Sequence, residues 1–372
     1  MSVKCRDIFN LIEKLAPTSI AEGWDNPGLQ VGDPHAEIET VMLTLDINID
    51  VVKEAKLKGA GLIISHHPLI FKPLKSLRLD QPSGKLVEYI IKNNITVYAA
   101  HTNLDVASGG VNSVLAEKLG LSETTVLEPA GREQYVKLVV FIPAGHVEDV
   151  HQAISGAGAG WIGNYSHCAF QTEGTGMFQP LAGTKPYIGE QGKLEQVKEV
   201  RLETIVPTNR LDAVIQAMLK THPYEEVAYD LYSLENPGPA YGLGRVGGLA
   251  CPVSFLEFAQ AVKKALGLPA VRLGGEAESK VKKVAVCGGA GAKLWPAALR
   301  AGADTFVTGD INHHEAQDML AAGLNFIDAG HHGSESVVLP ALKEYLERQC
   351  ISSGLNVKVT LSDINTNPFS FI

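Results

Sequence analysis

Apolar runs alternate with amphipathic stretches in the first third of the chain. Between residues 41 and about 128, short runs of aliphatic and β-branched side chains are separated by segments whose apolar residues have helical spacing. The runs are VMLTLDI, GLIIS and ITVYAA, and the spacing predicts helices near residues 50–58, 84–92 and 111–119. This alternation is typical of a largely parallel sheet whose strands are joined by helical crossovers.

The same alternation returns near the other end of the chain, after about residue 281. The runs are VKKVAVCGG, DTFVTGD and LNFIDAG, and helices are expected near residues 294–300, 315–321 and 336–347. We therefore predict an α/β fold in which the two ends of the chain form two similar α/β halves of one core domain.

The residues between these halves follow a different pattern. A strand-like run followed by a helical stretch occurs twice, at 134–143 with 147–154 and at 200–207 with 210–219, and a further strand is expected at 227–232. The run CAFQTEGTGMF between the two units is expected to form a hairpin. Two such units predict an inserted ferredoxin-like α+β domain with the order βαββαβ.

Turn-rich segments mark the edges of this middle region. They are EPAG at residues 128–131 and ENPGPAYGLG from Glu235 onward. We therefore predict a core α/β domain made of residues 1–130 and 239–372, with an inserted domain at residues 131–238.

Composition narrows the classes of protein. The 372 residues are 45% hydrophobic and 20% charged, which is typical of a folded globular protein. The net charge of -9 disfavours a long nucleic-acid interface, because such an interface needs clustered basic side chains. Five cysteines without a close pair favour a reducing cytoplasm. No apolar run approaches the ~18 to 20 residues that cross a bilayer, so we expect no membrane association.

Two glycine-rich stretches invite a phosphate-loop interpretation. They are GAGAG at residues 156–160 and CGGAGAK at residues 287–293. Neither has the spacing of a Walker motif or a complete dinucleotide fingerprint, so tight turning is the simpler explanation. Gly288 and Gly289 follow an apolar strand and precede a helix, which would also let the backbone approach a ligand at the edge of the sheet.

Histidines and acids gather where four of the predicted strands end. The four segments contain His66 and His67, then His101 and Asp105, then Asp310, His313 and His314, and finally His331, His332 and Glu335. Because the carboxyl ends of parallel strands meet at one edge, these side chains can share a pocket. Imidazole and carboxylate without thiolate suit zinc, iron(II), manganese, nickel or cobalt. The set is too large for one ion and suits two ions about 3.5 to 4 Å apart.

Each candidate has a structural alternative. His66 and His67 can both bind a metal only if the chain turns at Pro68, and His331 with Glu335 has the four-residue spacing of one helical face. Asp310, His313 and His314 could bind a metal directly or support the ligands from behind. A lone histidine such as His101 is often a structural residue. Trp24 and Leu29 in EGWDNPGLQVG could cap a pocket, although a hydrophobic loop anchor is the simpler interpretation. His222 with Glu225 or Glu226 could bind a second metal, although a helix-to-strand turn explains them more simply. The remaining histidines are interpreted as surface residues, namely His35, His146, His151 and His167.

Five motifs occur in order and carry a family resemblance. They are WDNPGLQVGD, SHHPLIF, HTNLD, TGDINHHEA and DAGHHGSE. Together they resemble the dinuclear metal-centre proteins called GTP cyclohydrolase 1 type 2 homologues. The middle region, with YVKLVVFIP, IGNYSHCAF and THPYEEVAYDLY, is similar to the module of longer bacterial members that resembles PII-type and CutA-type trimers.

The resemblance implies a site and an assembly. It implies two divalent metal ions per chain, zinc, iron or manganese, and a homohexamer in which two trimers form a hollow ring. The ligands it implies are His66, His67, Asp105, His331 and Glu335. His101, His314 and His332 lie near these residues in the sequence, and His101 and His314 are candidates for proton transfer.

The same resemblance implies a hydrolase of the GTP cyclohydrolase type that acts on a nucleotide-like small molecule. A metal ion can lower the pKa of bound water to about 7, which would supply the nucleophile. The alternative is a metal-binding assembly without catalysis, for storage, delivery or sensing of iron or zinc. A regulatory protein that binds other proteins or DNA is a third interpretation, and the acidic charge disfavours its DNA form.

Overall fold

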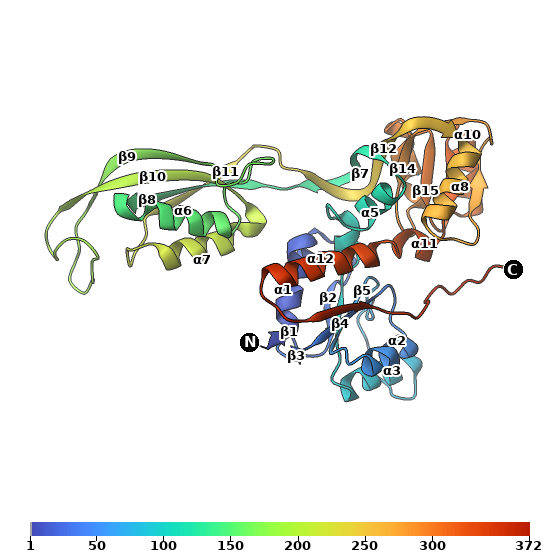
Figure 1. The fold of residues 1–372 in the computed structure, drawn as a ribbon, viewed down its shortest axis with the longest axis horizontal. Helices are drawn as coiled ribbons and strands as arrows, with labels where there is room; N and C mark the ends of the chain where they lie inside the picture. The colour runs from blue at the N-terminus through green and yellow to red at the C-terminus, as the bar shows by residue number, and fades with distance from the viewer. Residues whose placement is uncertain (1) are drawn as a thin grey trace. The chain divides into compact units, whose positions relative to one another are not determined.

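The computed structural model describes residues 2–372 (Figure 1). The chain divides into two compact units. The first joins the residues up to Ala130 with Tyr241–Ile372, and the second is Gly131–Ala240. Both units combine helices with sheets, so the predicted α/β character is confirmed. Within residues 2–372, no helix is both long and apolar enough to cross a bilayer.

The first unit contains a five-stranded sheet with the order β17-β4-β5-β6-β2. All neighbours are parallel except β2 and β6. Strands β4 and β5 are buried along their whole length, which explains why their sequences are continuous apolar runs. The strands are Thr40–Thr44 (β4), Leu62–Ser65 (β5), Thr96–Ala99 (β6), Gly28–Val31 (β2) and Lys358–Leu361 (β17), with helices Ile49–Leu57 (α2) and Pro82–Lys92 (α3) between them.

A six-stranded sheet with the order β13-β16-β15-β14-β12-β7 completes the first unit. Its centre, β14 to β16, is parallel, and β12 and β13 pair antiparallel with β14 and β16. The strands are Ser122–Arg132 (β7), Ala240–Ser254 (β12), Arg272–Gly274 (β13), Lys280–Val286 (β14), Thr305–Thr308 (β15) and Asn325–Asp328 (β16). Helices Phe255–Ala265 (α8), Trp295–Arg300 (α9) and His313–Ala321 (α10) accompany this sheet.

The two sheets do not correspond to two separate ends of the sequence. Helix α12 (Val338–Ser352) and strand β17 come from the end of the chain, yet β17 pairs with β4. In the same way, Leu342 and Leu346 of α12 share a core with Ile8 of α1 (Cys5–Leu15) and with Leu43. The last residues of the chain are thereby anchored beside the sheet formed by the first hundred.

A buried arginine joins β12 to the segment that follows Asp105. Arg245 is 5% exposed, and its guanidinium donates to the carbonyl oxygens of Gly242, Gly244 and Ala107 at 2.9, 2.7 and 2.9 Å. Its Nε also donates to Ser113 Oγ at 3.2 Å. Backbone oxygens therefore satisfy this charge, and they fix the chain just after Asp105.

The second unit has the element order β8, α6, β9, β10, α7, β11. Its antiparallel sheet has the strand order β11-β8-β10-β9, and α6 and α7 lie on one face (Figure 1). Apolar side chains that include Leu138, Val150 and Met218 form its core. The elements are Tyr135–Pro143 (β8), Val147–Gly156 (α6), Ala169–Phe178 (β9), Glu195–Pro207 (β10), Leu211–Thr221 (α7) and Tyr229–Leu234 (β11).

The predicted hairpin in CAFQTEGTGMF is wrong. Residues 169–178 form the single strand β9, which pairs with β10 along its length. The glycines do not turn the chain. A Cβ atom at Gly176 would come within 2.1 Å of the Glu199 carboxylate, so glycine gives room to a cross-strand side chain at this position.

Candidate metal centre

Three strands of the first unit deliver the candidate ligands. His66 and His67 follow β5, and His101 follows β6 and precedes α4 (Thr102–Val106), which carries Asp105. His331 and Glu335 are the first and last residues of α11 (His331–Glu335), which follows β16. The five-stranded and six-stranded sheets therefore both contribute side chains to one site, as expected where strand ends converge.

The five residues named as metal ligands from the sequence lie together. His66 Nε2 is 3.5 Å from Asp105 Oδ1 and 3.8 Å from Glu335 Oε1. On the other side of the carboxylate, Glu335 Oε2 is 3.1 Å from His67 Nε2 and 3.2 Å from His331 Nε2. Glu335 thus separates two sets of ligand atoms.

Ligand atoms within 4.8 Å of one another form three groups. One is His66, Asp105 and Glu335, and another is His67, His331 and Glu335. The third is His66, His67 and His101. Glu335 belongs to two of these groups.

Buried polar atoms without partners show that the site suits a cation. Neither His66 Nε2 nor Asp105 Oδ1 has a hydrogen-bond partner, although both atoms are shielded from solvent. Such groups are rare in folded proteins because they lose their hydration without compensation. Imidazole nitrogens and carboxylate oxygens that converge in this way are the donor set of zinc, iron or manganese.

The second nitrogen of each imidazole is already occupied. His66 Nδ1 donates to the Ala100 carbonyl at 2.8 Å. The other three donate from Nδ1 to carboxylates at 2.7 Å, namely His67 to Asp46, His101 to Asp25 and His331 to Asp310. These bonds keep Nδ1 of each ring as a donor and direct each Nε2 toward the centre of the site.

Asp46 and Asp25 are each held by a threonine. Asp46 Oδ2 accepts from Thr366 Oγ1 at 2.6 Å, and Asp25 Oδ2 accepts from Thr102 Oγ1 at 2.5 Å. Asp25, Asp46 and Thr366 are not among the site residues predicted from the sequence. Asp25 lies within WDNPG and Asp46 is the next-to-last residue of the run VMLTLDI, whereas no local pattern marks Thr366.

Thr366→Val should weaken metal binding by about tenfold, and Asp46→Asn by about 10- to 100-fold. The reason is that hydrogen bonds that orient a ligand, here those of Asp46 to His67 and of Thr366 to Asp46, contribute to metal affinity. Competition with a chromophoric chelator would measure these values. Thr366→Ser keeps the hydroxyl and serves as the matched control. Equal affinities for the valine and serine variants would contradict a role of this hydrogen bond.

Imidazolium groups balance the buried carboxylates within the protein. Burial alone lowers the pKa of His67, but Asp46 and Glu335 outweigh it and raise that pKa to about 10. The hydrogen bond to Glu335 likewise raises the pKa of His331 to about 9. Burial raises the pKa of Asp105 to about 6 although His66 is close. The site therefore binds protons that a divalent cation would displace.

The turn in CGGAGAK makes room for Glu335. A Cβ atom at Gly289 would lie 2.1 Å from Glu335 Oε1, and Gly289 has a φ of +64°, a conformation that favours glycine. Its backbone N–H donates to Ser334 Oγ at 2.9 Å. The glycines are thus explained by tight turning and by the approach of a carboxylate.

His314 is not brought into the site. His313 and His314 are exposed at the start of α10, and their rings contact each other. Neither belongs to a group of candidate ligands. Asp310, in contrast, reaches His331. The geometry therefore favours His101 over His314 as the residue beside the ligands.

Aromatic side chains lie next to His101. The Trp24 and Phe71 rings are 6.2 and 6.4 Å from the His101 ring and 5.8 Å from each other. Trp24 is 60% exposed, so it is not a buried loop anchor. It borders the site from the side of α4.

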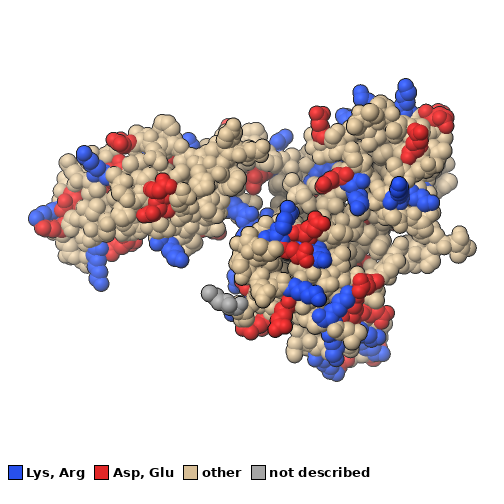
Figure 2. Space-filling model, viewed as in Figure 1, with Lys and Arg blue, Asp and Glu red and all other residues tan. Residues whose placement is uncertain are grey.

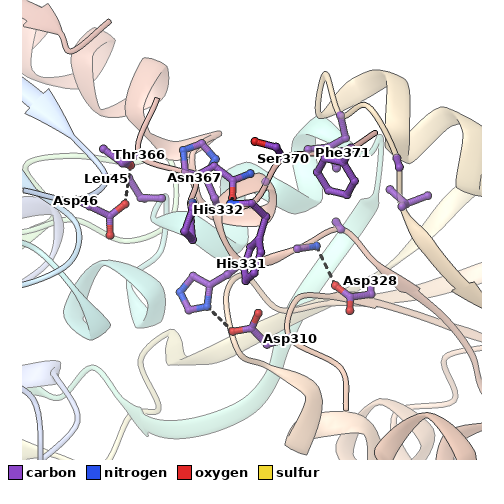
Figure 3. A pocket seen from close by; sticks show the side chains of 18 of the residues that line it. Leu45, Asp46, Asp310, Asp328, His331, His332, Thr366, Asn367, Ser370 and Phe371 are labelled. Carbon is purple, nitrogen blue, oxygen red and sulfur yellow. Dashed lines mark hydrogen bonds and ion pairs between the residues drawn. The ribbon is translucent and has the colours of Figure 1, made fainter. Parts of the chain in front are cut away.

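A cavity of about 1080 Å³ opens beside the site (Figure 3). His67 and His331 line it, together with Asp46, Asp310 and residues of the C-terminal segment. Figure 3 shows the Asp46–Thr366 and His331–Asp310 contacts at its wall. A molecule in this cavity would reach two of the candidate ligands directly.

Comparison with known proteins finds relatives over the whole chain. The family model described as Duf34/NIF3 (NGG1p interacting factor 3) matches residues 3–368. A Bacillus subtilis protein named GTP cyclohydrolase 1 type 2 homolog is 49% identical over 371 residues, which cover 100% of this chain and 99% of the relative. A Bacillus cereus protein related to NIF3 has a solved structure with a TM-score of 0.90, 45% identity and full coverage of both chains. The structure of Staphylococcus aureus protein SA1388 matches with a TM-score of 0.73 at 35% identity, covering 100% and 99% of the two chains.

Proposed function

The chain belongs to the Duf34/NIF3 family, and from this premise we propose that it is a dinuclear metal-dependent hydrolase that acts on a nucleotide-like small molecule. The observation that carries the proposal is the position of Glu335 between two sets of nitrogen and oxygen ligands. Two ions joined by a carboxylate are a common arrangement in enzymes that activate water.

Each metal ion would have its own ligands. His66 and Asp105 would hold one ion and His67 and His331 the other, with Glu335 shared. All donors are nitrogen or oxygen, which suits zinc, iron or manganese. The support behind them comes from Asp46, Asp310 and the Ala100 carbonyl.

The bound ions would lower the pKa of water and polarise the substrate. His101 is the candidate proton-transfer residue, because it lies in one group with His66 and His67. Burial tends to raise the pKa of Asp25, yet hydrogen bonds from His101 and Thr102 lower it to about 2. The ionised Asp25 accepts from His101 Nδ1, so Nε2 is free to accept a proton.

The test is a screen for turnover. Purified protein loaded with zinc, iron(II) or manganese would be assayed against GTP, other nucleotides and phosphoesters, with His101→Gln beside the wild type. We expect turnover that depends on the metal and falls by about 10²- to 10⁴-fold in His101→Gln, the range for a lost acid or base. The proposal fails if no activity survives removal of contaminants.

The second unit supports an alternative. Its order β8-α6-β9-β10-α7-β11 leads us to interpret residues 131–238 as an inserted ferredoxin-like domain in a core of residues 1–130 and 239–372. By the resemblance to PII-type and CutA-type modules, such domains would join the chains as trimers and the protein as a homohexamer. In that case the protein could store, deliver or sense iron or zinc without catalysis. Rapid metal exchange that responds to a partner would favour this alternative, and light scattering would test the hexamer.

We propose no nucleic-acid partner and a cytoplasmic location. The net charge is -9, and on the face drawn in Figure 2 basic side chains are interspersed with acidic ones and form no continuous basic stripe. A shift of DNA mobility at physiological salt would contradict the first part.

A further inference from the structure

The cavity beside the metal centre has walls from several parts of the chain. The largest contributions come from the β16–α11 connection, the segment before β13, and the C-terminal segment 366–371 (Figure 3), and residues after β4, β5 and β15 complete the lining. Its volume of about 1080 Å³ suits a small organic molecule, since ligand pockets commonly measure ~300 to 1,000 Å³. His67 and His331 belong both to its lining and to the candidate ligand set.

Much of the wall is apolar and aromatic. Leu45, Leu268 and Val271 line the cavity from the protein body, and Phe369 and Phe371 line it from the C-terminal segment. The two phenylalanines are 71% and 56% exposed, so most of their ring surface is not covered by the rest of the chain. Aromatic faces of this kind bind flat rings by stacking or edge-to-face contact.

The cavity offers no unpaired cation. His67 and His331 in its lining are already paired with Asp46, Asp310 and Glu335. Its only lysine or arginine is Arg272, whose guanidinium is paired with Asp328 and donates to the Ile311 carbonyl at 2.9 Å. Binding of a phosphate usually needs unpaired arginine or lysine donors. Three aspartates, Asp46, Asp310 and Asp328, line the same cavity. Each pairs with one of its cationic side chains, so these cations are already neutralised toward an anion.

One carboxylate oxygen of the lining remains available to a ligand. The Asp310 side chain is 47% exposed and uses Oδ2 to accept from His331 Nδ1. Its Oδ1 makes no hydrogen bond with residues 2–372. A ligand N–H group directed at Asp310 would therefore lie next to His331.

We propose that this cavity binds a flat aromatic ring compound that carries N–H donors and places no phosphate or other anionic group in the cavity. The ring packs against Phe369 and Phe371, and its N–H edge donates to Asp310. The claim that this ligand is the substrate rests on the proposed metal-dependent function. Any anionic part of such a substrate would have to be held at the proposed metal centre, because the cavity walls give it no unpaired cation.

Three probes of one ring size test the proposal: benzamide, benzamidine and phenyl phosphate. Their affinities would be measured by ligand-observed NMR on the full-length protein, both zinc-loaded and after treatment with a chelator. Without zinc, we expect benzamide and benzamidine to bind about tenfold more tightly than phenyl phosphate. The double variant Phe369→Ala/Phe371→Ala should weaken both by about fivefold, the size of an aromatic contact. Ile351→Ala, at an exposed position of α12 outside the lining, is the matched control.

The outcomes are distinct from those of the metal proposal. Equal or tighter binding of phenyl phosphate without zinc would overturn the inference. So would unchanged affinities in the double variant, or no binding of benzamide and benzamidine at millimolar concentration. A wild-type protein that binds no zinc would instead contradict the proposed function, and the series without zinc would still decide the ligand class.

Discussion

Glu335→Ala should remove metal from both positions at once, so that a protein that carries about two metal equivalents falls close to zero. Glu335 belongs to both principal ligand groups, and its side chain is only 5% exposed. Alanine leaves each ion with two protein ligands, fewer than the three that catalytic sites usually provide. Elemental analysis after dialysis against a weak chelator would measure the content.

Two other variants make this result specific. Asp105→Asn changes one group only, so the protein should retain about one equivalent. Glu344→Ala removes an exposed carboxylate from α12 and should retain both. If Glu335→Ala keeps two equivalents, the bridging role of this carboxylate is refuted.

Removal of the metal ions should lower the stability of the first unit substantially. His66, His67 and Asp105 come from the five-stranded sheet and its connections, whereas His331 and Glu335 follow β16 of the six-stranded sheet. An ion that binds only the folded protein adds about 4 kcal/mol to the free energy of unfolding when its free concentration is about a thousand times Kd. For a unit of this size, losing that contribution lowers Tm by about 8 to 16 °C.

Calorimetry with and without chelator would measure this shift. The second unit contains none of the ligands and should unfold at an unchanged temperature, which makes it an internal control. Tryptophan fluorescence would assign the transitions, because Trp161 lies in the second unit and Trp24 and Trp295 lie in the first. A first-unit transition that does not move on metal removal would show that the ions do not link the two sheets.

The strands and the positions of the candidate ligands after them could be predicted because their causes are local. Buried parallel strands such as β4 and β5 require continuous apolar runs, and ligands at strand ends follow those runs directly. His66, His67 and Glu335 are therefore visible in the sequence as residue types in a fixed relation to a strand. Tertiary proximity then follows from the geometry of a parallel sheet.

The remaining features depend on contacts between distant segments. Nothing near Thr366 indicates that it hydrogen-bonds to Asp46, 320 residues earlier. The sequence also does not predict that β17 pairs with β4, because the apolar pattern of a four-residue strand would fit either sheet. Glycines are ambiguous in sequence for a related reason: Gly176 of β9 and Gly289 after β14 give space to carboxylates of other segments.

The imidazole orientations have a kinetic consequence. Each ring is held through Nδ1 by a carbonyl or a carboxylate of the protein itself, so the rings need no rotation when an ion arrives. Loading should then be limited by loss of water from the ion and by departure of the displaced protons. Ions that exchange water quickly should enter this protein faster than slowly exchanging ones of equal final affinity.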